Sequence, residues 1–209
     1  MTWLYKISQK ISSLVLVGIF FKVEASGLEH LKNAPRPLLM IGCHKFFLDS
    51  FSLGVAIPFR FKNVLPLRIM GEAFRFRHSW LNLINKLGLI KLTYLMCGVF
   101  PAIRGVGLEK SLEAPVKLIK EGQIVFVHPE GRVVLEDKIE QFKRGAAYLA
   151  QETNASIIPV AFKISKPKKW KRRRYQVRFG EVFKIPQGLS LEENANYMRK
   201  IVSNLYETL

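Results

Sequence analysis

His44 and Asp49 are the two residues whose types and spacing most clearly suggest chemistry; they read H-K-F-F-L-D and follow the apolar run Leu38–Gly42. A histidine with a carboxylate partner can act as a general base near neutral pH. Five steps along a regular helix leave two side chains about 140° apart, and five steps along a strand put them on opposite faces. The pair can therefore meet only where the chain bends, as it does between a strand and a helix.

Two later segments carry polar residues at the ends of apolar runs. In Val99–Gly105, an apolar stretch ends on Arg104 and a glycine follows. Ile124–Arg132 begins as an apolar run, breaks at a proline, and continues with Glu130, Gly131 and Arg132. A guanidinium at a strand end suits a phosphate, because it is planar, always charged and bidentate. A surface arginine is the alternative for Arg104 taken alone. Strand ends in α/β sheets are where ligand groups collect, so these segments predict one shared site.

The combination of four segments in a fixed order carries more information than any one of them. The last of them pairs a helical pattern, Phe142–Ala150, with an apolar strand pattern, Ala155–Phe162. In this order the segments resemble the phospholipid and glycerol acyltransferase family, which includes the 1-acylglycerol-3-phosphate acyltransferases. The resemblance extends over Val23–Phe183 and rests on the combination, because each motif alone is common.

Four family motifs find a match in this chain. The N-H-x4-D motif is matched by His44 and Asp49, and the motif that ends on an arginine is matched by Arg104. F-P-E-G-T-R-S is matched in part by His128–Gly131, and the V-P-V-A-like strand is matched by Ile158–Ala161. The F-K-x-G sequence that follows the third motif in many members is also present, at residues 142–145.

The resemblance implies an acyltransferase that moves a fatty acyl group from a thioester to a lysophospholipid hydroxyl, most simply converting 1-acylglycerol-3-phosphate to phosphatidic acid. His44 would take the proton of the hydroxyl while Asp49 orients the imidazole. Backbone amides near Glu130 and Gly131, or those of the His44 turn, would stabilise the oxyanion. The donor would be acyl-CoA or an acylated carrier protein, with no cofactor and no metal ion. The substrate-binding residues would be Arg104, Glu130, Gly131 and Arg132, with Glu130 holding the arginines or an acceptor hydroxyl.

Three departures from the family pattern concern the acceptor. Cys43 stands where asparagine is usual, and Arg132 with two valines replaces Thr-Arg-Ser. Between the first two motifs, Met70 takes the place of a lysine two residues ahead of an acidic residue. The acyl-transfer residues are intact, whereas two phosphate contacts are absent or displaced. A different lysolipid, or an amine of a lipid, therefore stays open as the acceptor.

Composition limits the class of protein and of partner. The chain has 209 residues, 49% of them hydrophobic, which fits one domain with a full core. A formal net charge of +17 suits an anionic membrane surface, a nucleic acid or an acidic carrier protein. A non-enzymatic nucleic-acid-binding module would explain the charge but not His44 and Asp49, so we expect no nucleic acid partner. The two cysteines, Cys43 and Cys97, lack metal-ligand spacing and indicate a reducing compartment.

Two segments predict contact with a membrane. The first is a helix over residues 1–21, whose apolar run is about half the length that a bilayer span needs. We expect it to lie in the interface, and a buried core helix is the alternative. The second is a basic cluster with a central tryptophan, for which a solvated hairpin loop is the alternative. The predicted membrane-binding residues are Trp3, Lys10, Lys22, Lys168, Lys169, Trp170 and Lys171. From these two segments we expect a peripheral or monotopic protein on the cytoplasmic face of a membrane.

Alternating strand and helix patterns predict an α/β fold: a single acyltransferase domain over residues 22–209, with a mixed, mostly parallel sheet flanked by helices. The expected strands are 21–27, 38–42, 64–70, 99–103, 124–127, 157–164 and 175–179, the last of them antiparallel. The expected helices after the first are 48–57, 80–87, 108–120, 145–152 and 190–209. Ser190 and Glu193 predict a capping box at the start of the last helix.

Overall fold

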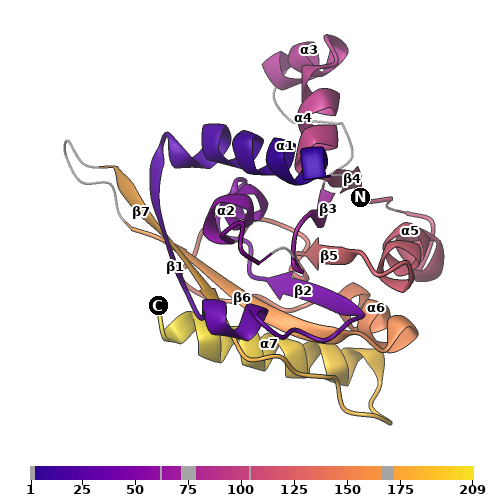
Figure 1. Cartoon of the computed structure of the whole chain (residues 1–209). Coiled ribbons are helices and arrows are strands. Elements are labelled where there is room, and N and C mark those ends of the chain that lie inside the picture. The colour runs from indigo at the N-terminus through magenta and orange to yellow at the C-terminus, as the bar shows by residue number, and fades with distance from the viewer. Residues whose placement is uncertain (1–2, 62, 72–78, 104, 166–171) are drawn as a thin grey trace.

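A mixed seven-stranded sheet organises the protein (Figure 1). The structure is a computed structural model and describes residues 3–61, 63–71, 79–103, 105–165 and 172–209. The sheet order is β1-β7-β6-β2-β5-β3-β4, and every neighbouring pair is parallel except β6 with β7. The strands are β1 (Phe21–Ser26), β2 (Leu38–Gly42), β3 (Leu67–Gly71), β4 (Val99–Pro101), β5 (Ile124–Val127), β6 (Ser156–Ile164) and β7 (Arg173–Phe179).

The central strands are buried on both faces. All residues of β2 and β5 are buried, and Leu39 of β2 pairs with Val125 of β5 on one side and Ile157 of β6 on the other. Continuous apolar runs of this kind are typical of parallel strands that helices cover on both sides. Because β2 and β5 run in the same direction, their carboxyl ends meet at one edge of the sheet, where the predicted catalytic segments begin.

Helices pack on both faces of the sheet (Figure 1). One face carries α1, its π-helical continuation and α2, and the other carries α5, α6 and α7, while α3 and α4 lie beyond α1. The helices are α1 (Trp3–Ser13), the π-helical segment (Leu14–Gly18), a 3-10 turn (Leu28–Leu31), α2 (Asp49–Ala56), α3 (Ser79–Lys86), α4 (Leu89–Cys97), α5 (Leu108–Lys120), α6 (Gly145–Thr153) and α7 (Leu191–Glu207).

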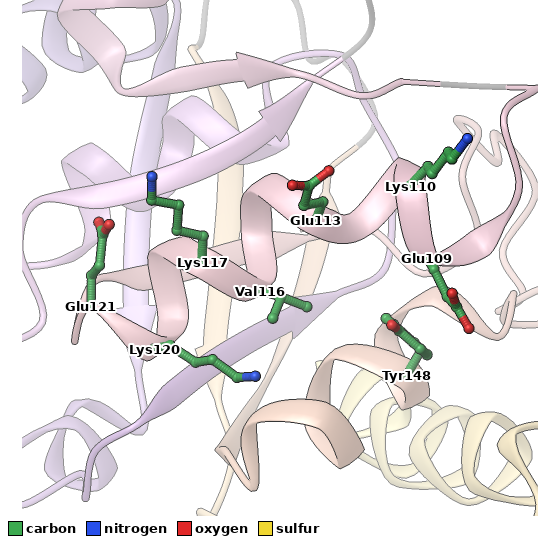
Figure 2. Close-up of a pocket in the computed structure, with 8 residues that line it drawn as sticks. All are labelled: Glu109, Lys110, Glu113, Val116, Lys117, Lys120, Glu121 and Tyr148. Carbon is green, nitrogen blue, oxygen red and sulfur yellow. The ribbon is translucent and has the colours of Figure 1, made fainter.

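Helix α5 shows how amphipathic sequence places these helices. It buries Leu112, Pro115 and Ile119 against the protein and turns alternating acidic and basic side chains outward. Those side chains line a pocket beside Tyr148 of α6 (Figure 2). Carboxylates and ammonium groups alternate around this pocket, and it contains no residue of the predicted site, so it is a surface feature of the α5–α6 packing.

The predicted fold class is confirmed, and most predicted elements are present. The bounds of β2, α5 and β5 are those expected, and Ser190 caps α7 in a capping box with Glu193. Two differences concern helices. The first helix ends at Gly18, because β1 begins at Phe21, and α4 was not predicted. Gly88 ends α3 as expected, but a second helix starts directly after it.

Candidate active site

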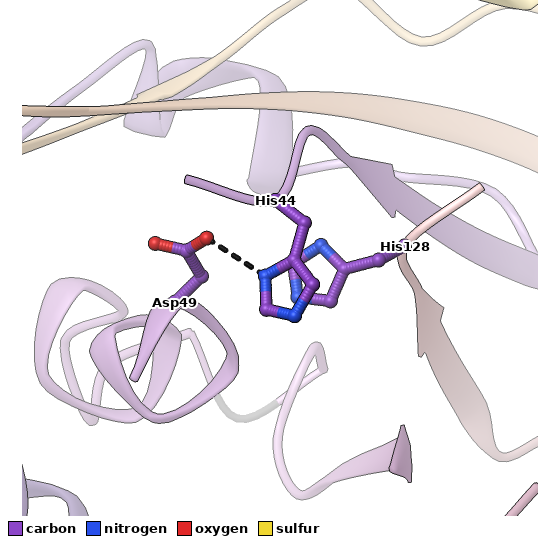
Figure 3. Close-up of side chains that lie close together, drawn as sticks. All are labelled: His44, Asp49 and His128. Atoms are coloured by element: carbon purple, nitrogen blue, oxygen red, sulfur yellow. Dashed lines mark hydrogen bonds and ion pairs between the residues drawn. The ribbon is translucent and has the colours of Figure 1, made fainter. Parts of the chain in front are cut away.

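The chain bends between β2 and α2, and this bend brings His44 and Asp49 together (Figure 3). Strand β2 ends at Gly42, and α2 begins at Asp49 itself. His44 Nδ1 lies 3.0 Å from Asp49 Oδ2. The spacing required a strand-to-helix bend for the two side chains to meet, and the structure has this bend. The His44 side chain is 19% exposed and that of Asp49 is 0% exposed, so solvent reaches the histidine but not the carboxylate.

Hydrogen bonds from several directions fix the Asp49 carboxylate. Oδ2 accepts the backbone N–H groups of Lys45 at 2.5 Å and Phe46 at 2.8 Å, in addition to His44 Nδ1. Oδ1 accepts the hydroxyl of Tyr175, which is fully buried on β7. An ionised carboxylate only accepts, so the proton in the His44 contact belongs to Nδ1. His44 Nε2 therefore keeps its lone pair and is available to take a proton.

Tyr175 is a site residue that the sequence did not reveal. Burial, followed by the negative charge of Asp49, raises the pKa of Tyr175 well above its ordinary value. The phenol thus stays protonated and remains a donor to the carboxylate. Tyr175 belongs to an alternating strand pattern outside the four family-like segments, and it lies 126 positions from Asp49. Only the sheet order, which places β7 beside β6, brings the two residues together.

Glu130 braces the His44 turn from within the protein. It is 3% exposed, and burial raises its pKa. Its Oε2 accepts the backbone N–H of His44 at 2.6 Å, and its Oε1 accepts the N–H of Glu140 at 2.9 Å. We expected Glu130 to hold the arginines or an acceptor hydroxyl. Both of its oxygens instead accept hydrogen bonds from backbone N–H groups, because a buried carboxylate needs donors and the two adjacent loops supply them.

Arg132 lies on the surface near this turn. Its Nε and one terminal nitrogen donate to the carboxylate of Glu140 at 2.8 and 2.7 Å, and its side chain is 69% exposed. Gly131 has a φ of 67°, and its N–H donates to His128 O at 3.0 Å, which closes the turn. Arg104 lies outside the described residues. The structure thus shows one of the two predicted phosphate-binding arginines, and that one is engaged in an ion pair.

The backbone amides that we expected to stabilise an oxyanion already have acceptors. The His44 N–H donates to Glu130, the N–H groups of Lys45 and Phe46 donate to Asp49, and that of Gly131 donates to His128 O. An oxyanion hole needs donors directed at the substrate. These four amides are therefore engaged within the protein in this arrangement, since they build the turn that holds the histidine, and the oxyanion hole stays a prediction.

Cys43 does not have the properties of a nucleophile at this site. It is fully buried, and its sulfur accepts the N–H of Phe162 at 3.3 Å. Burial, followed by the negative charge of Asp49, raises the pKa of this thiol. The reactive species of cysteine is the thiolate, so a buried thiol of raised pKa next to a carboxylate is inert.

His128 stacks on His44, which the sequence also did not reveal. The ring centroids are 3.9 Å apart and the ring planes differ by 11° (Figure 3). His128 Nδ1 lies 3.0 Å from Gly42 O, and its Nε2 lies 3.0 Å from Ser50 Oγ. Potential ligand atoms of His44, Asp49 and His128 are within 4.8 Å of one another. Parallel rings direct their nitrogen lone pairs side by side instead of at one point, so the arrangement fits a hydrogen-bonded base better than a metal centre.

The predicted membrane-binding residues fall into three groups. Trp3 is 66% exposed at the start of α1, and Lys22 is exposed and pairs with Glu24 at 3.2 Å. Lys10 turns inward and donates to Val55 O and Ile57 O at 3.0 and 2.5 Å. The expectation that Lys10 contacts headgroups is therefore wrong; the free carbonyls at the end of α2 attract a cation. The remaining residues, Lys168, Lys169, Trp170 and Lys171, lie outside the described residues.

The Acyltransferase family model matches residues 22–163, about two thirds of the chain. This chain belongs to that family. The match includes His44, Asp49, Glu130 and Arg132, and it stops before Tyr175. As an Acyltransferase domain, the chain places its H-x4-D motif at the bend between β2 and α2 and its third motif at the end of β5.

Several proteins similar to this chain carry the name 1-acyl-sn-glycerol-3-phosphate acyltransferase. The chloroplastic one of Arabidopsis thaliana is 25% identical over 158 residues, which are 72% of this chain and 38% of that protein. The one of Bacillus subtilis is 32% identical over 126 residues, which are 59% of this chain and 54% of that protein. The chain thus spans about half or less of the length of these relatives.

A solved structure shares the fold. The 1-acyl-sn-glycerophosphate acyltransferase PlsC of Thermotoga maritima matches with a TM-score of 0.64 and 17% sequence identity, covering 98% of this chain and 78% of that one. At this identity the likeness establishes the fold and leaves the acceptor, the donor and the membrane contact to be argued from the residues.

Proposed function

We propose that this protein transfers a fatty acyl group from an acyl thioester to the hydroxyl of 1-acylglycerol-3-phosphate. The observation that carries the proposal is the His44–Asp49 pair, in which Asp49 fixes the proton on Nδ1 and leaves Nε2 as a base. Family membership supports acyl transfer as the reaction class, and the names of the relatives favour this acceptor.

His44 would carry one proton through a direct transfer. Nε2 takes the proton of the acceptor hydroxyl as its oxygen attacks the thioester carbonyl, and Asp49 stabilises the imidazolium that forms. When the tetrahedral intermediate collapses, the C–S bond breaks, and the proton passes from Nε2 to the leaving thiolate. A new oxygen ester and a free thiol result, and His44 returns to its starting state. Cys43 takes no part, because its buried thiol stays protonated.

Arg132 and Arg104 would bind the acceptor's phosphate. Arg132 is exposed at the loop that follows β5, and its guanidinium already makes a bidentate contact with a carboxylate. A phosphate presents a similar pair of oxygens, so the acceptor would replace Glu140 as the partner. The same ion pair favours the alternative acceptors, another lysolipid or a lipid amine, if Glu140 is the permanent partner of Arg132.

The acyl donor would be acyl-CoA or an acylated carrier protein. Both are anionic, and a net charge of +17 suits either of them, so charge does not choose between the two. The thioester supplies all the activation that the reaction needs, and the proposal uses no cofactor and no metal ion.

We propose a peripheral or monotopic attachment to the cytoplasmic face of an anionic membrane. None of the described helices is both long and apolar enough to span a bilayer. Helix α1, the π-helical segment and the turn that follows it instead expose a series of large apolar side chains, namely Trp3, Ile11, Leu14, Val15, Ile19 and Phe20. Helix α4 packs against α1, where Ser8 Oγ donates to Met96 O at 3.4 Å.

The helices next to α1 extend this apolar surface. Helices α3 and α4 and the turn between them expose five leucines, namely Leu83, Leu87, Leu89, Leu92 and Leu95. Large apolar side chains exposed together on neighbouring helices indicate an interaction surface. A helix with one apolar outer face can lie in the lipid interface without spanning the bilayer. The acceptor is itself a membrane lipid, which makes the bilayer the natural partner of this face.

An acyl-transfer assay of the purified protein tests the proposal. Acyl-CoA and acylated carrier protein are each offered with 1-acylglycerol-3-phosphate, with lysophospholipids that carry a headgroup, and with a lipid amine, and mass spectrometry identifies the products. We expect phosphatidic acid as the dominant product with at least one donor. Faster acylation of another acceptor would move the assignment to that lipid. Absence of transfer to all acceptors from both donors would contradict it.

A further inference from the structure

His128 holds a position where the family motif has phenylalanine, and it makes contacts that phenylalanine cannot make. Its Nδ1 lies 3.0 Å from Gly42 O, and its Nε2 lies 3.0 Å from Ser50 Oγ. Its ring stacks on His44 with centroids 3.9 Å apart. His44 and Asp49 lie between Gly42 and Ser50 in the sequence, so the two hydrogen bonds of His128 hold both ends of the turn that carries the base.

Hydrogen bonding and burial together indicate the protonation state of His128. A carbonyl oxygen only accepts, so Nδ1 carries the proton that is donated to Gly42 O. The loss of solvent around the ring, followed by the charge of His44, lowers the pKa of His128 well below its ordinary value, which favours the neutral imidazole. In the neutral ring Nε2 has a lone pair, and Ser50 Oγ donates to it. A neutral ring matters here, because a cation stacked on His44 would oppose formation of the imidazolium.

We propose that His128, oriented by Ser50 and by the carbonyl of Gly42, is a positioning residue that fixes the plane of the His44 imidazole and thereby aims Nε2 at the acceptor hydroxyl. The inference rests on the proposed function of His44 as the base. It adds a second requirement to the site. Asp49 fixes the tautomer of His44 through an in-plane hydrogen bond, and His128 fixes the ring from its face. A phenylalanine would provide the face without the two hydrogen bonds.

The test compares Ser50→Ala and His128→Phe with wild type, with Ser156→Ala as the matched control. Ser50 is 8% exposed and Ser156 is 3% exposed, so both substitutions remove a buried hydroxyl, but Ser156 lies at the opposite end of the central strands from His44. We expect Ser50→Ala and His128→Phe each to lower kcat by about tenfold, with the acceptor KM changed by about twofold or less. The reason is that the orientation of the base changes, whereas the residues that bind the acceptor do not. Ser156→Ala should leave both constants near wild type.

Nitrogen NMR of the histidine side chains supplies a readout that does not depend on turnover. In wild type, His128 should keep the signature of the neutral Nδ1–H form at neutral pH, because its pKa is lowered well below its ordinary value. Ser50→Ala should allow a larger fraction of His128 Nε2 to carry a proton at the same pH, and His128→Phe should change the nitrogen chemical shifts of His44, because the ring that stacks on it is replaced. Both variants are compared by circular dichroism first, and Ser50→Ala keeps the test informative if His128→Phe does not fold.

Three results would overturn the inference. The first is a kcat within about twofold of wild type for both variants. The second is a charged His128 in wild type near neutral pH. The third is an acyl group covalently bound to Ser50 after incubation with donor, which would make Ser50 and His128 a nucleophile and its base. If wild type itself transfers no acyl group, the proposed function fails, and the NMR comparison alone decides whether His128 is neutral and holds the ring of His44.

Discussion

Asp49 contacts more residues at this site than the H-x4-D motif indicates. Its carboxylate is completely buried and accepts donors from His44, from two backbone amides of the turn and from Tyr175 on β7. The first three are local, because they come from residues within five positions of Asp49, and the motif spacing predicts that such contacts are possible. The hydroxyl of Tyr175 comes from a strand near the end of the chain, and no local pattern announces it.

Removing the Tyr175 hydroxyl should affect both stability and catalysis. Tyr175→Phe deletes one donor to a buried carboxylate and leaves the ring, so we expect the free energy of unfolding to fall by about 1.5–3 kcal/mol. We also expect kcat to fall several-fold, because Asp49 holds His44 less firmly. Denaturant unfolding and steady-state kinetics measure the two effects. Tyr197→Phe, at a partly exposed position on α7, is the control. Unchanged stability and kcat would mean that the phenol is not a partner of Asp49.

Arg132 and Glu140 together test the phosphate-binding role. If Arg132 binds the acceptor's phosphate, Arg132→Ala should raise the acceptor KM by about tenfold or more, which corresponds to a lost charged hydrogen bond. The donor KM should not change. Glu140→Gln, which weakens the competing ion pair, should lower the acceptor KM or leave it unaltered. Equal, small losses in both variants would instead show that the ion pair is a surface contact and would favour an acceptor without a phosphate here.

The sequence located the His44–Asp49 pair and missed its neighbours for a physical reason. His44 and Asp49 are five positions apart, so one bend explains their meeting. His128 was part of a motif match, but its stacking on His44 depends on β5 lying next to β2, which periodicity does not reveal. Glu130 was expected to hold arginines or an acceptor hydroxyl, yet its partners are backbone N–H groups, and a sequence does not show which backbone groups are buried.

At the scale of elements, strongly apolar or strongly amphipathic segments were predictable. Strands β2 and β5 are continuous apolar runs, and α5 has the helical period, so their bounds were those expected. Helix α4 was missed because Leu89–Cys97 is apolar on most sides, and such a run has no clear period. The order of the strands was also beyond the sequence, since β1 pairs with β7 through contacts between opposite ends of the chain.

Gln9 provides a test of how firmly α1 belongs to the fold. It is 2% exposed, donates to Leu67 O at 2.9 Å and to Cys97 O at 2.5 Å, and accepts the N–H of Leu67 at 2.9 Å. Gln9→Leu leaves these backbone groups without partners, so we expect the free energy of unfolding to fall by about 2–4 kcal/mol. Chemical denaturation measures it, with Gln151→Leu at an exposed site of α6 as control. If Gln9→Leu lowered the free energy of unfolding no more than Gln151→Leu does, α1 would be attached only loosely.

At the scale of the whole molecule, a charge of +17 and an apolar outer face on α1 predict membrane binding with two components. Deleting residues 1–21 would confuse the two with unfolding, because Gln9 and Lys10 bond to the body of the protein. Exposed positions avoid this difficulty, since the side chains there contact little of the protein.

Replacing Trp3, Ile11 and Phe20 by serine should therefore reduce flotation with anionic vesicles at all salt concentrations, because apolar burial is not screened. Changing Lys168, Lys169 and Lys171 to alanine should matter mainly at low salt, where the Debye length is long. The control is the double variant Leu189→Ser with Tyr197→Ser, which replaces two exposed residues, one next to α7 and one within it. Equal flotation of all four proteins would remove the proposed membrane face.

The central claim is that His44 is the base for acyl transfer to a lipid hydroxyl, and the rate of that transfer with His44→Ala tests it most directly. The measurement is single-turnover formation of phosphatidic acid from 1-acylglycerol-3-phosphate and the better donor, with His30→Ala as a control histidine in the 3-10 turn. General-base catalysis contributes about 10²- to 10⁴-fold. We predict a loss of at least about 100-fold for His44→Ala in a folded protein, with His30→Ala near wild type. A rate close to wild type for His44→Ala would contradict the account.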